Sequence, residues 1–314
     1  MGQGNKTQTW MSEFILLGLS SDWGTQVSLF VLFLAMYLVT IVGNVLILLL
    51  IRLDSRLHTP MYFFLSVLSL VDLCYSSSIV PQMLVHLLSV QKSIPISFAH
   101  CMIQLYFFIA LMCTECVLLA AMAYDRYVAI CCPLHYPTIM SHGLCFRLAL
   151  GSWTIGFGIS LAKTYFISRL SFCGPNVINH FFCDISPVLN LSCTDMLNQA
   201  VIFAASMLVL VGPLGLVLLS YARILAAILR TRSGEGRGKA FSTCSSHLCV
   251  VGLFFGSAIV MYMAPTSRHP EKQQKILSLF YSLFHPMLNP LIYSLRNAEI
   301  KGALRRVLWK DRLM

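Results

Sequence analysis

The sequence contains few charged residues. Asp, Glu, Lys and Arg together make up 11% of its 314 residues, whereas soluble globular chains average about 25%. Hydrophobic residues make up 57%. Because so few charges cannot cover a surface that faces water, an ordinary soluble protein is excluded, and the composition indicates a chain that lies in a lipid bilayer.

The motifs of common enzyme classes are also missing. The zinc motif HExxH does not occur, and the nine histidines lack the spacing of metal ligands. The glycine-rich stretch from Ser233 to Ala240 has alanine after its lysine, where a P-loop needs serine or threonine. We therefore predict that the protein is not an enzyme.

The sequence does contain long runs with almost no charge. A helix that spans a bilayer needs about 20 mostly apolar residues, and six runs meet that length. A seventh run has Arg147 and Lys163 near its ends, whose long side chains can reach the membrane interface. We predict an all-α integral membrane protein, a seven-transmembrane helix bundle, with spans at about 26–51, 60–84, 101–125, 143–166, 196–222, 240–265 and 275–295.

The basic residues orient this bundle. With seven spans, 15 of the 22 lysines and arginines fall on the side of the C-terminus. The positive-inside rule then places residues 1–25 outside and the tail 296–314 in the cytoplasm. We interpret the net charge of +10 as a topology signal and predict no nucleic-acid partner. Asn5 begins an Asn-Lys-Thr sequon on the outer side, which predicts glycosylation.

The cytoplasmic tail has a helical pattern. Ile300, Leu304 and Val307 recur at helical spacing, with Lys301 and Arg305 between them. This pattern predicts a short amphipathic eighth helix that lies on the anionic inner leaflet.

One predicted loop, residues 167–195, is unusually long. A loop of about 30 residues without regular structure is uncommon unless it is functional or cross-linked. It contains three of the four cysteines on the outer side, where disulfides persist. We predict a cross-linked cap over the extracellular mouth. The spacing does not choose among the three possible pairings of Cys101, Cys173, Cys183 and Cys193.

Two acidic residues, Asp72 and Glu115, lie inside predicted spans. Ionisable groups in a membrane are costly and are functional candidates by default. The two carboxylates could share a proton, hold a cation such as sodium, or form a hydrogen-bonded core cluster without an ion. A transporter could use the same pair as a proton or cation relay.

Three stretches resemble a known family. "MAYDRYVAICCPLHY" (Met122–Tyr136), "KAFSTCSSHL" (Lys239–Leu248) and "PMLNPLIYSLRN" (Pro286–Asn297) are similar to segments of class II odorant (olfactory) receptors, which are rhodopsin-like G-protein-coupled receptors. The resemblance extends over nearly the whole chain. It implies a plasma-membrane receptor of olfactory neuron cilia. Such a receptor binds small volatile organic molecules in its helix bundle, activates a stimulatory olfactory-type G protein and raises cyclic AMP.

The resemblance also assigns roles to individual residues. It implies the disulfides Cys101–Cys183 and Cys173–Cys193. In the family, Arg126 is held by Asp125 in the silent receptor and is released on activation. The other residues that it assigns to switching and G-protein coupling are Tyr127, Tyr221, Arg237, Lys239, His247, Asn289, Pro290 and Tyr293. It places Asn44 beside Asp72 and Glu115 in an intramembrane polar site.

Alignment with the family gives a ligand pocket of mostly apolar residues with a few hydroxyls. Such a lining suits a small uncharged ligand. Phe108 occupies the place where an amine receptor has an aspartate. Two alternatives stay open: a rhodopsin-like receptor for a non-odorant ligand, and a cation-coupled transporter, which seven spans without a half-repeat disfavour. The pocket residues are Phe108, Ile109, Met112, Cys113, Ser206, Phe255, Ile259, Tyr262 and Ser282.

Overall fold

The structure is a computed structural model that describes residues 12–20, 22–89, 93–173, 175–193, 196–230, 234–263 and 271–310. Within these ranges, the side chains of 196–199, 234–240, 242–243, 262–263, 271–272, 295–296 and 308–310 are outside the description. Asn5 and the side chains of Arg237, Lys239 and Tyr262 therefore lie outside the described residues, and the predictions for them stand as made.

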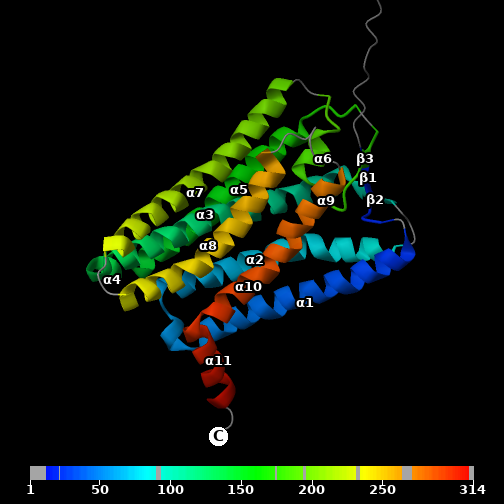
Figure 1. Ribbon diagram of the computed structural model, residues 1–314. Helices are drawn as coiled ribbons and strands as arrows, with labels where there is room; N and C mark the ends of the chain where they lie inside the picture. The colour runs from blue at the N-terminus through cyan, green and yellow to red at the C-terminus, as the bar shows by residue number, and fades with distance from the viewer. Residues whose placement is uncertain are drawn as a thin grey trace, which may run out of the picture.

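Long helices packed side by side make up the bundle (Figure 1). The helices are α1 (Trp23–Leu53), α2 (Pro60–Leu88), α3 (Phe98–Cys131), α4 (Tyr136–Ile139), α5 (His142–Ser168), α6 (Ile185–Leu189), α7 (Met196–Arg230), α8 (Gly234–Met263), α9 (Glu271–Leu279), α10 (His285–Arg296) and α11 (Ala298–Lys310). Single turns occur at η1 (Ser55–Leu57) and η2 (Pro133–His135), and a π-helical segment occurs at η4 (Phe280–Phe284).

Local sequence sets the starts of these helices. The Asp22 carboxylate accepts a hydrogen bond from the backbone N–H of Thr25 at the start of α1. Ser97 and Ser141 cap α3 and α5 in the same way. Such side chains satisfy backbone N–H groups that have no partner inside the helix. Pro60 occupies the first position of α2, where a missing N–H has no cost.

Six described helices are long and apolar enough to cross a membrane: α1, α2, α3, α5, α7 and α8. The seventh span is continuous but consists of three parts, α9, η4 and α10. Pro286 lies just after the π-helical segment and has no N–H to donate to the preceding turn, which is a common cause of such irregularity. The predicted seven-helix fold is confirmed.

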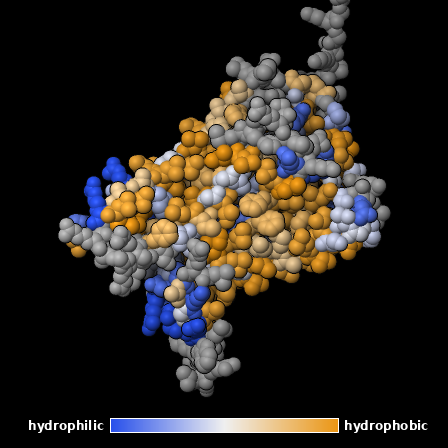
Figure 2. All heavy atoms as spheres, in the orientation of Figure 1, coloured by the Kyte–Doolittle hydropathy of each residue, from blue (hydrophilic) through white to orange (hydrophobic). Residues whose placement is uncertain are grey.

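Helix α3 lies at the centre of the bundle and packs most extensively against α5 and α7. The α3–α5 contact depends on Gly156. A Cβ atom there would collide with Thr114 Oγ1 and lie 2.7 Å from the backbone carbonyl oxygen of Ala110. Small residues allow membrane helices to approach this closely. Figure 2 shows hydrophobic side chains along the flank of the bundle and hydrophilic ones gathered toward its ends, as a lipid environment requires.

A small sheet covers the outer end of the bundle, which the all-α expectation did not include. Strand β1 (Glu13–Leu17) pairs antiparallel with β2 (Ser93–Ser97) and parallel with β3 (Val177–Ile178). Phe14 and Leu16 on β1 are fully buried against the bundle, whereas their neighbours are more exposed. The segment before the first span is therefore part of the extracellular cap.

Helix α11 leaves the inner end of the bundle beside α1 and α10 and points away from it (Figure 1). Ile300 and Ala303 are buried in the inner half of the core. The guanidinium of Arg306 donates to Asp54 Oδ2, with Nε at 2.8 Å, and the Tyr62 hydroxyl donates to Glu299 Oε2 at 2.8 Å. The predicted amphipathic eighth helix is present, and protein contacts hold it in addition to any lipid contact.

Candidate functional site

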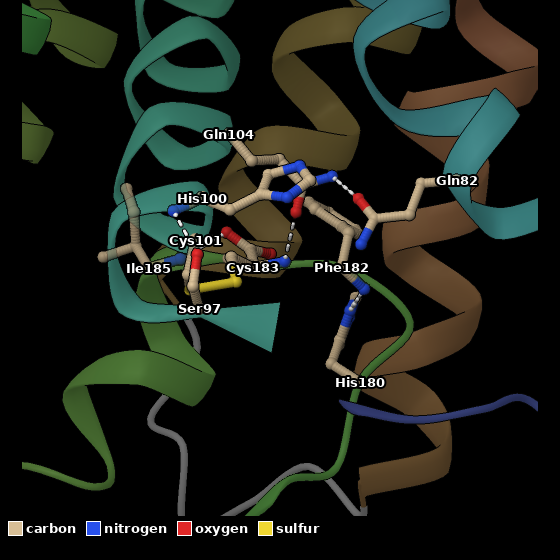
Figure 3. Close-up of a disulfide and its surroundings, with 10 residues drawn as sticks. Gln82, Ser97, His100, Cys101, Gln104, His180, Phe182, Cys183 and Ile185 are labelled. Carbon is tan, nitrogen blue, oxygen red and sulfur yellow. Dashed lines mark hydrogen bonds between the residues drawn. A yellow bond between two sulfur atoms is a disulfide. The ribbon is translucent and has the colours of Figure 1, made fainter. Parts of the chain in front are cut away.

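The long loop between α5 and α7 is covalently bonded to the outer end of α3. The disulfide Cys101–Cys183 joins them, with Cα atoms 5.5 Å apart (Figure 3). Beside it, the backbone N–H of Cys183 donates to Gln104 Oε1 at 3.0 Å, and Gln104 Nε2 donates to Gln82 Oε1 at 2.6 Å. A second disulfide, Cys173–Cys193, closes the loop on itself. Both pairings are the ones that the family resemblance implies.

The same loop is also hydrogen-bonded to the seventh span. His180 Nε2 lies 3.0 Å from Ser278 Oγ, and the Tyr281 hydroxyl donates to Asp184 Oδ2 at 2.9 Å. All four side chains are buried. This cluster could not be predicted from the sequence, because its members come from segments about 100 residues apart.

Burial and the positive charge of Lys275 lower the pKa of His180 to about 3, so this imidazole is neutral at pH 7. In the unfolded chain, a histidine has a pKa near 6.5 and gains a proton as the pH falls below that value, whereas the folded protein keeps His180 neutral. The free energy of unfolding is therefore highest above pH 6.5 and decreases as the pH falls. Lowering the pH from 6.5 to 5 should therefore cost the receptor about 2 kcal/mol of stability.

Thermal unfolding of the purified receptor at pH 7 and pH 5 measures this effect. His180→Gln keeps a neutral polar group and should reduce the difference between the two pH values. His142→Gln is the matched control, because His142 is exposed at the start of α5. An equal pH effect in the wild type and the His180→Gln variant would show that His180 is not responsible.

The structure divides the predicted ligand residues between two hydrophobic clusters. Phe108, Ile109 and Cys113 belong to the outer cluster under the loop, whereas Phe255 and Ile259 belong to or pack against the inner cluster. Phe255 is buried within the inner cluster, and its assignment to the ligand pocket stays a prediction.

Three of the predicted residues do come together. Met112, Cys113 and Ser206 line one small pocket between α3 and α7, below Ile185 of the extracellular loop. Lys163 of α5 also lines this pocket, and the sequence pattern had identified it only as a residue near a span end. Ser282 lies elsewhere, on η4, where its hydroxyl is buried without a hydrogen-bond partner in the described structure.

Phe108 is fully buried among aromatic rings. Its centroid lies 5.3 Å from that of Phe182, 5.6 Å from that of Tyr75 and 5.8 Å from that of Tyr281. Aromatic pairs at these distances stabilise a core by about 0.5–1.5 kcal/mol beyond their area burial. Phe108 therefore connects α3 with the extracellular loop, α2 and the seventh span.

The two intramembrane acids lie close together, with a third ionisable residue beside them. Potential ligand atoms of Asp72, Glu115 and His285 all lie within 4.8 Å of one another. His285 Nδ1 is 3.3 Å from Glu115 Oε1. Asn289 Nδ2 donates to both carboxylate oxygens of Asp72, at 3.0 and 3.2 Å. The sequence pattern predicted the pair but missed His285.

Several polar atoms near these acids are buried without hydrogen-bond partners in the described structure, including Asn44 Oδ1 and Asn289 Oδ1. Asn44 Nδ2 donates to the carbonyl oxygens of Thr40 and Pro286, which joins α1 to the seventh span. Buried polar groups normally have partners. Free amide and carboxylate oxygens fit a hard cation or ordered water, so the donor set is compatible with sodium.

The arginine of the Asp-Arg-Tyr motif differs from the expectation. Asp125 Oδ1 accepts a hydrogen bond from the Tyr136 hydroxyl at 2.8 Å, and the ion pairs among the described residues do not include Asp125 with Arg126. Arg126 is nevertheless 94% buried, with 6% of its surface exposed. Tyr136 belongs to α4, and a buried carboxylate needs such a donor. The sequence pattern missed Tyr136.

Other predicted switch residues surround the inner end of α3. The Tyr221 hydroxyl lies 2.7 Å from His247 Nδ1, which links α7 to α8. The Tyr293 hydroxyl is buried without a partner among the described residues. Tyr127 packs against the inner cluster. Pro290 fits against Gly43 of α1, where an added Cβ would lie 3.0 Å from the proline ring.

Comparison with known proteins decides the family. The family model described as "Olfactory receptor" matches residues 33–311. The chain belongs to the olfactory receptor family. It is 63% identical to human Olfactory receptor 2A5 and 60% identical to human Olfactory receptor 2A12, each over 98% of this chain and 99% of the relative. It is 55% identical to the dog Olfactory receptor-like protein OLF3, over 98% and 96% of the two chains.

Membership in this family makes the chain a multi-pass membrane receptor for odorants and not an enzyme. The family fold also agrees with the seven spans of the structure. The pairing of Asp125 with Tyr136, the cluster around His285 and the position of Lys163 come from the structure alone.

Proposed function

We propose that this olfactory receptor binds small volatile organic molecules between α3 and α7, and that binding activates a stimulatory olfactory-type G protein and raises cyclic AMP. The observation that supports this proposal is the pocket lined by Met112, Cys113 and Ser206 below Ile185 of the extracellular loop. Apart from the Ser206 hydroxyl and the Lys163 ammonium group, its lining is apolar, which suits a small ligand with one polar group. In this proposal the receptor acts in the plasma membrane of olfactory neuron cilia.

Met112 offers a route from the ligand to the G protein. Its side chain packs against both the outer and the inner hydrophobic clusters. The inner cluster also contains Tyr293 and contacts Tyr127, next to Arg126. A ligand that displaces Met112 would therefore change the packing of the inner cluster, because close-packed interiors shift between discrete arrangements and do not deform continuously.

Met112→Ala should raise the agonist concentration for half-maximal cyclic AMP by about tenfold. Removing the apolar contacts of one methionine costs about 1.5 kcal/mol, and 1.4 kcal/mol corresponds to a factor of ten. A screen of small volatiles with a cyclic AMP readout supplies the agonist.

Met102→Ala is the matched control, because Met102 is buried in the same helix but belongs only to the outer cluster and does not line the pocket. It should lower surface expression without shifting potency in this way. An unchanged potency of every agonist on Met112→Ala would contradict the proposed pocket.

The acids in the membrane suggest regulation of this response by sodium. Asp72, Glu115 and Asn289 would hold the ion through oxygen atoms, and its positive charge would neutralise the two neighbouring carboxylates. Agonist potency of the wild type should then fall several-fold in sodium compared with N-methylglucamine, and Asp72→Asn should remove the difference. Equal potency of the wild type in both salts would exclude sodium and leave a shared proton or a hydrogen-bonded cluster without an ion.

A further inference from the structure

A groove lies on the outer half of the bundle between α5 and α7. Its volume is about 460 Å³, which falls within the range of small-molecule sites. Its walls include Phe166 and Leu208, which are 60% and 75% exposed on the flank of the bundle. Because that flank faces lipid, the groove opens toward the membrane and is separate from the small pocket between α3 and α7.

Lys163 lines this groove on the α5 side, farther inward along the helix than Arg169. Its side chain is 94% buried, with 6% of its surface exposed, and its ammonium group donates to Ser206 Oγ at 2.9 Å. Lys163 and Val209 line both the groove and the pocket that contains Met112 and Cys113. The ammonium group therefore stands at the boundary between the two spaces.

Within the described part of the chain, this ammonium group lacks a counter-charge. Among the residues that the structure describes, no carboxylate lies within ion-pair distance of Lys163. The Ser206 hydroxyl is neutral and also donates to the carbonyl oxygen of Ile202. An isolated charge away from water is costly unless it is paired, so an anion at this point would be stabilised.

A second cation lies nearer the outer end of the groove, at the end of α5. Arg169 lines it and places its guanidinium over the ring of Tyr165, 5.3 Å from the centroid. The remaining lining residues are mostly aliphatic or aromatic. The groove thus combines an apolar wall, a membrane-side opening and positive charge, which is complementary to a molecule with one carboxylate and a hydrocarbon chain.

We propose that this groove binds a monocarboxylic acid, whose carboxylate pairs with Lys163 in place of Ser206 and whose alkyl chain lies along the wall toward Leu208. The acid enters from the membrane side. The ligand could be an odorant acid that has partitioned into the bilayer or a fatty acid of the membrane itself, because both present the same chemistry.

The test measures binding of octanoic acid, labelled with ¹³C at the carboxyl carbon, to the purified full-length receptor in nanodiscs. Octanoic acid should bind at least tenfold more tightly than 1-octanol of the same chain length. Lys163→Met should weaken binding of the acid roughly 10- to 100-fold, the value of a charge-assisted hydrogen bond, and leave the alcohol unchanged. Lys163→Arg should retain binding of the acid.

Two further variants make the result decisive. Lys301→Met removes a lysine from exposed α11 and should bind the acid like the wild type. Leu208→Trp should block the groove from the lipid side and abolish acid binding with Lys163 still in place, which tests the site even if Lys163→Met does not fold. Equal binding of acid and alcohol, or full acid binding by folded Lys163→Met or Leu208→Trp, would overturn the proposal.

Nanodiscs doped with oleic acid distinguish the two sources. If oleic acid displaces labelled octanoic acid from the wild type, the groove accepts a membrane fatty acid, and if it does not, the groove selects the shorter volatile acid. Either result supports the proposal. Because binding is measured directly, its outcome does not depend on the odorant pocket or on cyclic AMP signalling.

Discussion

Replacing Cys101 by serine should remove the receptor from the cell surface. The disulfide Cys101–Cys183 closes a segment with a sequence separation of 82 residues, and chain entropy alone assigns such a closure about 4.5 kcal/mol. That amount is a large part of the 5–15 kcal/mol by which proteins are typically stable. Cys183→Ser should have the same effect, measured by surface labelling of intact cells.

The second disulfide should matter less. Cys173–Cys193 has a sequence separation of 20 residues, for which the same argument gives about 3.3 kcal/mol. Its loss also leaves the loop attached to α3 through Cys183. Cys74→Ser is the control, because Cys74 is a free and exposed cysteine and should have no effect. Normal surface expression and ligand response of Cys101→Ser would show that the disulfide has no structural role.

Arg126→Ala should abolish agonist-driven cyclic AMP while the receptor still reaches the surface. Arg126 is buried at the inner end of α3, and Asp125 is already satisfied by Tyr136. Removing Arg126 therefore leaves no buried carboxylate without a partner, which is the usual cause of severe destabilisation. The G protein would lose the cation that the family exposes on activation.

A matched control is available on the next span. Arg147→Ala removes an exposed arginine of α5 and should preserve both expression and signalling. Surface labelling and cyclic AMP are measured in the same cells, so that loss of signal is not confused with loss of receptor. Full signalling by surface-expressed Arg126→Ala would rule out the switch role.

The fold was largely accessible from the sequence because membrane insertion is a local property. Uncharged length fixes where a helix can span, and the lysines and arginines fix its direction. The irregular seventh span was still counted, since composition does not depend on whether its turns are α or π. The three-stranded sheet was missed because β1, β2 and β3 are short and come from segments up to about 165 residues apart.

The chemistry of the sites could be predicted only in part from the sequence. Asp72 and Glu115 were predicted because an acid is conspicuous in an apolar run, and the structure brings them together. The place of Phe255 in the ligand pocket stays a prediction, because a shared helix face does not say at which depth a side chain meets its neighbours. Tyr136 gave no signal, since a tyrosine in a short loop has many possible partners.

The sequence by itself determined the membrane class, the number of spans, their orientation and the family, because each depends on composition or on short contiguous motifs. Only the tertiary structure decided which side chains share a site. Lys163 lies next to Ser206 of another helix, and His285 lies next to Glu115. Such contacts depend on how helices rotate and cross, which is set by packing across the whole bundle and not by any local stretch.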